Sequence, residues 1–287
     1  MTTYPCDWVD AFTDRAFTGN GCAVVHGADT LDLDTRLALV RETSLTECAY
    51  IVASDRADFG ARYYLRHREI PMAGHPTVAT VASLLHRGLV ARGQDFTLEV
   101  GAGVMPIRVH GDGRIEMRQP APVFGTAFAP EVIAPIVGLA AEDVVGTPRI
   151  TSTGSPFCIT LLRDRAALAR ARLDAQALAD WRAGLGPQGN LIEPYLVTLT
   201  DEGTHARLLL PPPGPTEDPF TGSATGCAAC WLWAEGHLPR PDYVATQGDE
   251  MGRPGRAWVR VLGPRDAIEG VSVAGHGHVL ISGSLLL

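Results

Sequence analysis

Most of the chain consists of short apolar segments separated by polar, Gly-containing or Pro-containing ones, which is typical of β-strands. Strand-like segments include residues 48–54, 61–67, 96–111, 157–164 and 194–200. The segments that read as helices are 33–43, 76–88, 173–184 and 224–236. Strands and helices alternate too rarely for a doubly wound sheet. The pattern predicts an α+β fold with curved, mixed or antiparallel sheets.

The helices expected at 76–88 and 224–236 are small-residue and apolar on nearly every face. Such helices are expected to be buried rather than to lie on a surface. Each segment ends in a glycine, Gly88 or Gly236, which suits a left-handed C-terminal cap. The pattern predicts one buried central helix in each half of the chain.

The segments that precede these two helices are alike. Residues 69–76 (EIPMAGHP) and 217–224 (EDPFTGSA) share the order Glu, any residue, Pro, large apolar residue, small residue, Gly. Two further matches occur in the same order along the chain: 44–52 with 190–199, and 18–25 with 153–160. These matches predict a duplication of one β-rich unit, with a boundary in the Pro-rich segment 118–130.

The formal net charge is −8, without a cluster of Lys or Arg, so nucleic acid and anionic membranes are not expected partners. Apolar residues make up 46% of the chain, yet no apolar run approaches the ~18 residues of a membrane-spanning helix. The N-terminus shows no signal-peptide pattern, and the six cysteines show no disulfide-dense spacing. We therefore expect a cytoplasmic protein.

The first residues of the two buried helices are candidates for anion binding. His75 precedes Pro76, and proline is favoured at the first helical position, which predicts His75 as an N-cap. Ser223 holds the matching place in the second half and is a good N-cap residue. Two such N-termini facing one cleft would bind a substrate carboxylate. The alternative is that both residues are only caps.

Glu47, at the entrance of an apolar strand, is a candidate acid–base group. A glutamate in this position is most often solvated. Burial in a cleft would instead raise its pKa toward the range useful near neutral pH. The pattern alone does not choose between these interpretations. Glu193 takes the corresponding position in the second half.

The sequence lacks the common cofactor motifs G-x-G-x-x-G, Walker loop, G-x-S-x-G and H-E-x-x-H. Residues 275–278 (GHGH) carry two histidines without a carboxylate, which is a poor metal site. Cys227 and Cys230 form a C-x-x-C without a second pair, and we expect them to pack inside a helix. No cofactor and no metal are expected.

Six segments occur in an order found in one protein family. They read VDAFTDRAFTGNGCAVV, SLTECAYIV, IPMAGHPTVATVASLL, EDPFTGSATGCAA, QGDEMGRPGRAWVRV and VSVAGHGHVLISGSL. Together they resemble the phenazine-biosynthesis PhzF-like family of the diaminopimelate epimerase-like superfamily. The resemblance implies two pseudo-symmetric domains, each a curved sheet or barrel around a central helix, at residues 1–120 and 121–267. It also implies that C-terminal strands at 268–287 return to the first domain and that the protein is a homodimer.

The resemblance further implies a cofactor-independent isomerase with its active site between the domains. By motif match, Glu47 moves a proton on a small carboxylate-bearing substrate, and His75 and Asp218 are the other catalytic residues. The residues assigned to substrate binding are Asn20, Gly74, Thr221, Gly222 and Ser223.

The chain departs from its wider superfamily at two informative positions. Related epimerases and racemases carry a cysteine directly before each helix-opening glycine, whereas this chain has Ala73 and Thr221. Besides the isomerase, a second interpretation is an amino-acid racemase or epimerase, and this difference counts against it. A non-catalytic binding protein on the same fold is the third, and the retained Glu47, His75 and Asp218 count against it.

Overall fold

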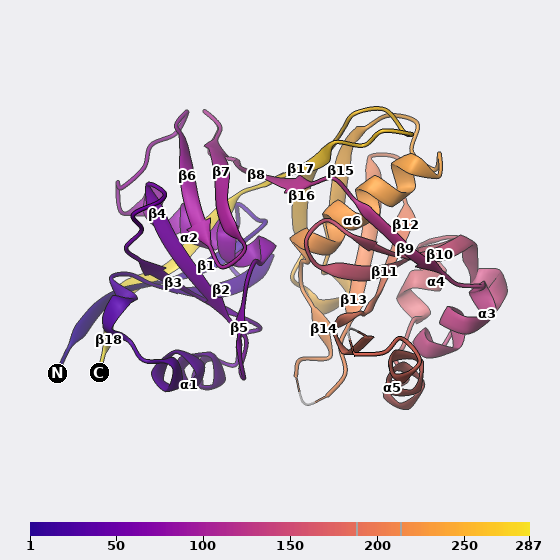
Figure 1. Cartoon of the computed structure of the whole chain (residues 1–287), viewed down its shortest axis with the longest axis horizontal. Helices are drawn as coiled ribbons and strands as arrows, with labels where there is room; N and C mark the ends of the chain where they lie inside the picture. The colour runs from indigo at the N-terminus through magenta and orange to yellow at the C-terminus, as the bar shows by residue number, and fades with distance from the viewer. Residues whose placement is uncertain (188, 213) are drawn as a thin grey trace. The chain divides into compact units, whose positions relative to one another are not determined.

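The computed structural model describes residues 1–187, 189–212 and 214–287 (Figure 1). The chain divides into two compact units: unit 1 comprises residues 1–118, 255–257 and 274–287, and unit 2 comprises 119–254 and 258–273. The first division falls at the start of the Pro-rich segment. Residues 268–273 lie in unit 2 rather than returning with the rest of the C-terminal segment, because β17 (Gly270–Gly275) runs from one unit into the other.

Unit 1 contains two regular helices and a set of strands. Its elements are β1 (Thr3–Ala11), β2 (Asn20–Val25), η1 (Ala28–Thr30), α1 (Leu33–Thr43), β3 (Cys48–Val52), β4 (Phe59–Tyr64), β5 (Glu69–Ile70), α2 (Gly74–His86), β6 (Asp95–Val100), β7 (Gly103–Val109), β8 (Ile115–Pro120) and β18 (Gly277–Leu286). β1 pairs antiparallel with both β2 and β18. The sheet therefore joins the two ends of the described chain.

Unit 2 carries more helical segments outside its sheet. Its elements are β9 (Val123–Ala127), α3 (Pro130–Ile133), η2 (Ala134–Val137), η3 (Ala141–Asp143), β10 (Val144–Ser152), β11 (Pro156–Leu162), α4 (Arg165–Arg170), α5 (Ala175–Ala183), η4 (Gly189–Leu191), β12 (Pro194–Leu199), β13 (Gly203–Leu209), β14 (Glu217–Asp218), α6 (Gly222–Ala234), β15 (Asp242–Gln247) and η5 (Asp249–Met251). β16 (Gly255–Leu262) and β17 contribute to both units.

The strand pairings repeat between the units. In unit 1, β2 runs parallel to β3, β3 antiparallel to β4, β4 antiparallel to β5, and β4 parallel to β6. In unit 2 the same four relations join β11, β12, β13, β14 and β15. The helices α2 and α6 occupy the same place in this order, before β6 and β15 respectively. The predicted α+β fold with two pseudo-symmetric halves is confirmed.

Both central helices are buried, as their apolar composition predicts. α2 packs against β1, β2, β3 and β18, and α6 packs against β10, β11 and β12 (Figure 1). Each is followed by the expected left-handed glycine: φ is 69° at Gly88 and 79° at Gly236. Among the described residues, no helix has both the length and the apolar character to cross a bilayer.

A buried polar cluster fixes the C-terminal end of α2. The carboxylate of Asp7 is fully buried and accepts hydrogen bonds from Nε and Nη2 of Arg87, each at 2.7 Å, and from Oγ of Ser83 at 2.5 Å. Nε2 of His26 lies 2.6 Å from the same Oγ. Burial lowers the pKa of His26 to about 4, with Arg87 as a second cause. The cluster holds β1 to the helix through an ion pair.

Candidate active site

The predicted site residues of unit 1 lie together at the N-terminal end of α2. Asn20 begins β2, and Glu47 directly precedes β3, which runs parallel to β2. Gly74 and His75 are the first two residues of α2, which packs against both strands. The repeat unit thus gathers segments that are far apart in the sequence around one imidazole.

His75 is 4% exposed, and its imidazole lies between an amide and a carboxylate. Nδ2 of Asn20 is 3.2 Å from its Nδ1, and Oε2 of Glu47 is 3.4 Å from its Nε2. Burial lowers the pKa of His75 to about 3, so the ring is neutral near pH 7. Because the amide of Asn20 donates to Nδ1, the single ring proton lies on Nε2 and faces Glu47. Among the described residues, Nε2 has no regular hydrogen-bond acceptor.

Glu193, the repeat counterpart of Glu47, has different surroundings. It directly precedes β12, as Glu47 precedes β3. Its Oε1 accepts a hydrogen bond from Nη2 of Arg182 at 2.7 Å. Burial raises the pKa of Glu193, and the arginine opposes this effect. Glu193 therefore forms a structural ion pair, whereas Glu47 faces a neutral imidazole.

The predicted N-caps of the two central helices are wrong. α2 begins at Gly74 after the N-cap Ala73, and α6 begins at Gly222 after the N-cap Thr221. The glycines already belong to the helices, so His75 is the second helical residue, as is Ser223 in α6. Neither N-cap side chain bonds to its helix. The first-turn N–H groups therefore lack side-chain caps and can serve a ligand.

The predicted site residues of unit 2 surround the start of α6. They are Asp218, Thr221, Gly222 and Ser223. Oγ1 of Thr221 donates to Oδ2 of Asp218 at 2.5 Å, and both side chains are buried. Gln247, at the end of β15, donates from Nε2 to the carbonyl oxygen of Asp218 at 2.7 Å and accepts from the N–H of Thr221 at 3.2 Å. The Asp218 carboxylate therefore has a fixed orientation.

The structure thus groups the predicted residues by unit: one group around His75 and one around Asp218. That both groups bind one substrate stays a prediction. Sequence reasoning missed Gln247 and Tyr195, whose hydroxyl donates to Oε1 of Gln247 at 3.0 Å. The available signal was the segment QGDEMGRPG, which contributes to the family resemblance.

Backbone strain is concentrated next to the group in unit 1. Among the described residues, the non-glycine residues with positive φ are Phe12 (61°), Phe17 (64°) and Ser44 (55°). The first two lie in the loop that leads to Asn20, and Ser44 lies in the segment that leads to Glu47. Such conformations are costly and tend to occur at functional sites.

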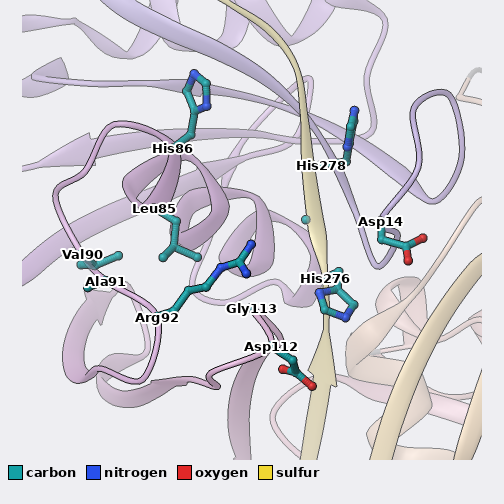
Figure 2. Close-up of a pocket in the computed structure, with 11 residues that line it drawn as sticks. Asp14, Leu85, His86, Val90, Ala91, Arg92, Asp112, Gly113, His276 and His278 are labelled. Atoms are coloured by element: carbon teal, nitrogen blue, oxygen red, sulfur yellow. The ribbon is translucent and has the colours of Figure 1, made fainter.

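A polar cavity of about 630 Å³ in unit 1 lies apart from these residues. It is found at the C-terminal end of α2, where Leu85, His86, His276 and Asp112 contribute to its lining (Figure 2). None of the predicted site residues lines it. Within the described ranges, no cluster of His, Cys, Asp and Glu side chains could hold a metal ion.

Comparison with known proteins identifies the family of this chain. The profile of the family described as phenazine biosynthesis-like protein (PhzC-PhzF) matches residues 9–283. The chain belongs to this family. A PhzF-family protein of Bacillus anthracis has a structure similar to this one, with a TM-score of 0.86 and 27% identity, and the match covers 100% of both chains.

Curated PhzF-family relatives have isomerase names. The chain is 30% identical over 285 residues to the uncharacterized isomerase YddE of Escherichia coli K12, covering 95% of each protein. It is 27% identical over 289 residues to the trans-2,3-dihydro-3-hydroxyanthranilate isomerase of Pseudomonas aeruginosa, covering 97% of this chain and 98% of that protein. The predicted enzyme class, an isomerase, is confirmed.

The PhzF fold also extends to epimerases. A hydroxyproline epimerase from Agrobacterium vitis matches 99% of this chain and 92% of its own, with a TM-score of 0.66 and 12% identity, which shows a shared fold alone. In this PhzF-family chain, the residues at the two helix N-caps are Ala73 and Thr221. No thiol stands at either helix N-terminus, in agreement with the sequence prediction.

Proposed function

We propose that this PhzF-family isomerase moves a proton between carbon atoms of a small carboxylate-bearing substrate without a cofactor. Glu47 acts as the general base and then as the general acid: its carboxylate removes a proton from one carbon, and the resulting carboxylic acid returns it to another. The observation that carries the proposal is the contact of 3.4 Å between Glu47 and the buried, neutral His75.

His75 fits a supporting role in this proton transfer. With a pKa of about 3 it does not compete with Glu47 for the substrate proton near pH 7. Its protonated Nε2 lies 3.4 Å from Oε2 of Glu47 and would orient the carboxylate once this contact shortens to a hydrogen bond. Asn20 in turn keeps that proton on Nε2. The chain of contacts supports Glu47, rather than His75, as the group that exchanges protons.

The substrate carboxylate would bind at an uncapped first helical turn, for which α2 and α6 are each a candidate. Backbone N–H groups of Gly74, Gly222 and Ser223 lie at these positive helix ends. The carboxylate of Asp218, held by Thr221, would orient an amino or hydroxyl group of the substrate. The name of the Pseudomonas aeruginosa relative supports a cyclic carboxylate of the dihydroanthranilate class.

An amino-acid racemase or epimerase is the alternative within this superfamily. Two-base racemisation needs an acid–base group on each side of one carbon. The N-cap positions that would supply two thiols hold Ala73 and Thr221, and the hydroxyl of Thr221 already donates to Asp218. These contacts favour the proton shift along the substrate.

We also propose a cytoplasmic homodimer. β18 contains no Asp, Glu, Lys or Arg, and 60% of Ile281 is exposed. An uncharged strand with an exposed large apolar side chain is suited to contact with another protein surface, and the family resemblance implies that this surface belongs to a second copy. Light scattering should give twice the mass of one chain, and Ile281→Lys should shift it toward the monomer. A monomer mass for the wild-type protein would contradict this proposal.

The proton-transfer proposal is tested by deuterium uptake in D2O, read by mass spectrometry. The substrates are trans-2,3-dihydro-3-hydroxyanthranilate and, for the racemase alternative, proline. Glu47→Gln should reduce uptake by ~10²–10⁴-fold, the usual contribution of general acid–base catalysis. Glu193→Gln is the matched control and should retain uptake close to wild type. Equal small losses in both variants would show that Glu47 is not the acid–base group.

A further inference from the structure

An exposed aromatic ring lies close in sequence to the group around His75. Phe17 belongs to the loop between β1 and β2, three residues before Asn20, and 68% of the residue is exposed. Among the described residues, it is the only aromatic one in the set of large hydrophobic residues that are exposed. A ring so exposed contributes little to the core of unit 1.

The backbone holds this ring in an unfavourable conformation. Phe17 has a φ of 64°, where a bulky side chain is strained and glycine is not. Its N–H donates to Oδ2 of the buried Asp10 at 2.8 Å. On either side of it, the hydroxyls of Thr13 and Thr18 lie 2.5 Å apart. The loop thus fixes Phe17 through contacts on both sides, although the ring itself gains little burial.

The group that holds Phe17 also lies beside the candidate site. Asp10 pairs with Gly21, the neighbour of Asn20 in β2. A Cβ atom on Gly21 would lie 3.6 Å from Oδ1 of Asp10 and 3.1 Å from Cδ2 of Leu45. Leu45 is two residues before Glu47. The anchor of Phe17 is therefore paired with the strand that carries Asn20, and Gly21 of that strand lies beside Leu45 of the segment that leads to Glu47.

We propose that Phe17 contacts the ring of the substrate and selects ring-bearing carboxylates over ring-free ones. This inference rests on the proposed function, because it assumes that the substrate binds beside Glu47. A planar unsaturated ring offers a face against which a phenyl ring packs in an offset or edge-to-face arrangement. An exposed ring loses its water only when the ligand arrives, so the contact stabilises the complex rather than the free fold.

Isothermal titration calorimetry with 2-aminobenzoate tests the contact without requiring catalysis. Phe17→Gly should bind this ligand roughly 10-fold more weakly, because a phenyl contact is lost. Its thermal midpoint should be no lower than that of wild type, because glycine removes the strain at this φ. Phe17→Leu keeps an apolar side chain and should bind with intermediate affinity. Val123→Ala, which shortens another exposed apolar residue, is the control and should bind normally.

The outcomes separate this inference from the proposed proton transfer. Unchanged affinity in Phe17→Gly, a marked fall in its thermal midpoint, or a wild-type protein that does not bind 2-aminobenzoate would each overturn the ring contact. Ring-dependent binding without any deuterium uptake would leave the contact standing and refute the proton transfer. If deuterium uptake depends on Glu47 but the affinity for 2-aminobenzoate is the same with and without the Phe17 side chain, only the ring contact is refuted.

Discussion

Replacing Asn20 by aspartate changes one group beside His75 with almost no change in size. In the wild-type protein the amide donates to Nδ1 over 3.2 Å, which keeps the ring proton on Nε2, facing Glu47. A carboxylate cannot donate and accepts from Nδ1–H instead. The neutral ring would then present the lone pair of Nε2 to the carboxylate of Glu47, and two acceptors would face each other.

The expected loss of turnover in Asn20→Asp follows from the loss of the contact between Nε2 of His75 and Oε2 of Glu47. In the free protein Nε2 of the buried His75 and Oε2 of Glu47 are 3.4 Å apart and form no regular hydrogen bond, so what is lost is the bond that forms when the two atoms approach during turnover. Hydrogen bonds to charged groups contribute about 1.5–3 kcal/mol, and each 1.4 kcal/mol is about a factor of ten. We expect Asn20→Asp to lower turnover by ~10–150-fold. The length of the contact, 3.4 Å, favours the lower end of this range.

The assay combines turnover with 15N NMR of labelled histidine, which distinguishes the two neutral tautomers. A new carboxylate raises the pKa of a neighbouring imidazole, so both measurements are made at about pH 8.5, where the ring stays neutral. Asn190→Asp makes the same charge change at an exposed position and should change neither result. If Asn20→Asp keeps both the Nε2–H tautomer and full turnover, Asn20 does not position His75.

The remaining predictions concern stability, measured by urea unfolding. Gly226→Ala would place Cβ 2.0 Å from Oε1 of Gln119 and should cost about 1–3 kcal/mol. Arg87→Met leaves the buried carboxylate of Asp7 unpaired and should cost about 3 kcal/mol; a loss below about 1 kcal/mol would contradict the buried ion pair. For His26, the folded pKa of about 4 lies below the ordinary value near 6.5, so the unfolded chain takes up the proton first. The free energy of unfolding should therefore fall as pH drops from about 6.5 to 4, and His26→Asn should flatten this slope.

Much of the fold follows from patterns that depend on neighbouring residues. The helix predicted at 33–43 matches α1. The duplication could be recognised because Glu-x-Pro and the helix-opening glycine occur at matching positions in the two halves of the sequence. The first residue of each central helix could not be predicted from such patterns. Pro76 fits any of the first helical positions, so local preference does not show that Gly74 is already helical.

The candidate site was only partly predictable, because its chemistry depends on contacts between distant segments. Glu47 and Glu193 are equivalent by sequence, and only the structure shows that Arg182 neutralises the second. The low pKa of His75 likewise comes from burial, which no local motif encodes. Gln247 lies at the end of a strand far from Asp218 along the chain and meets it only after β13, β14 and β15 are assembled.

The return of the chain to unit 1 has a consequence for biosynthesis. A ribosome makes every residue of unit 2, up to Val273, before it makes β18, the strand that pairs with β1. As the chain leaves the ribosome, every segment of the second unit is therefore available before the first unit receives its strand against β1 and α2. This reverses the usual N-terminal-first order of cotranslational folding. A released chain truncated after Val273 should protect α6 from proteolysis while β1 remains open to cleavage.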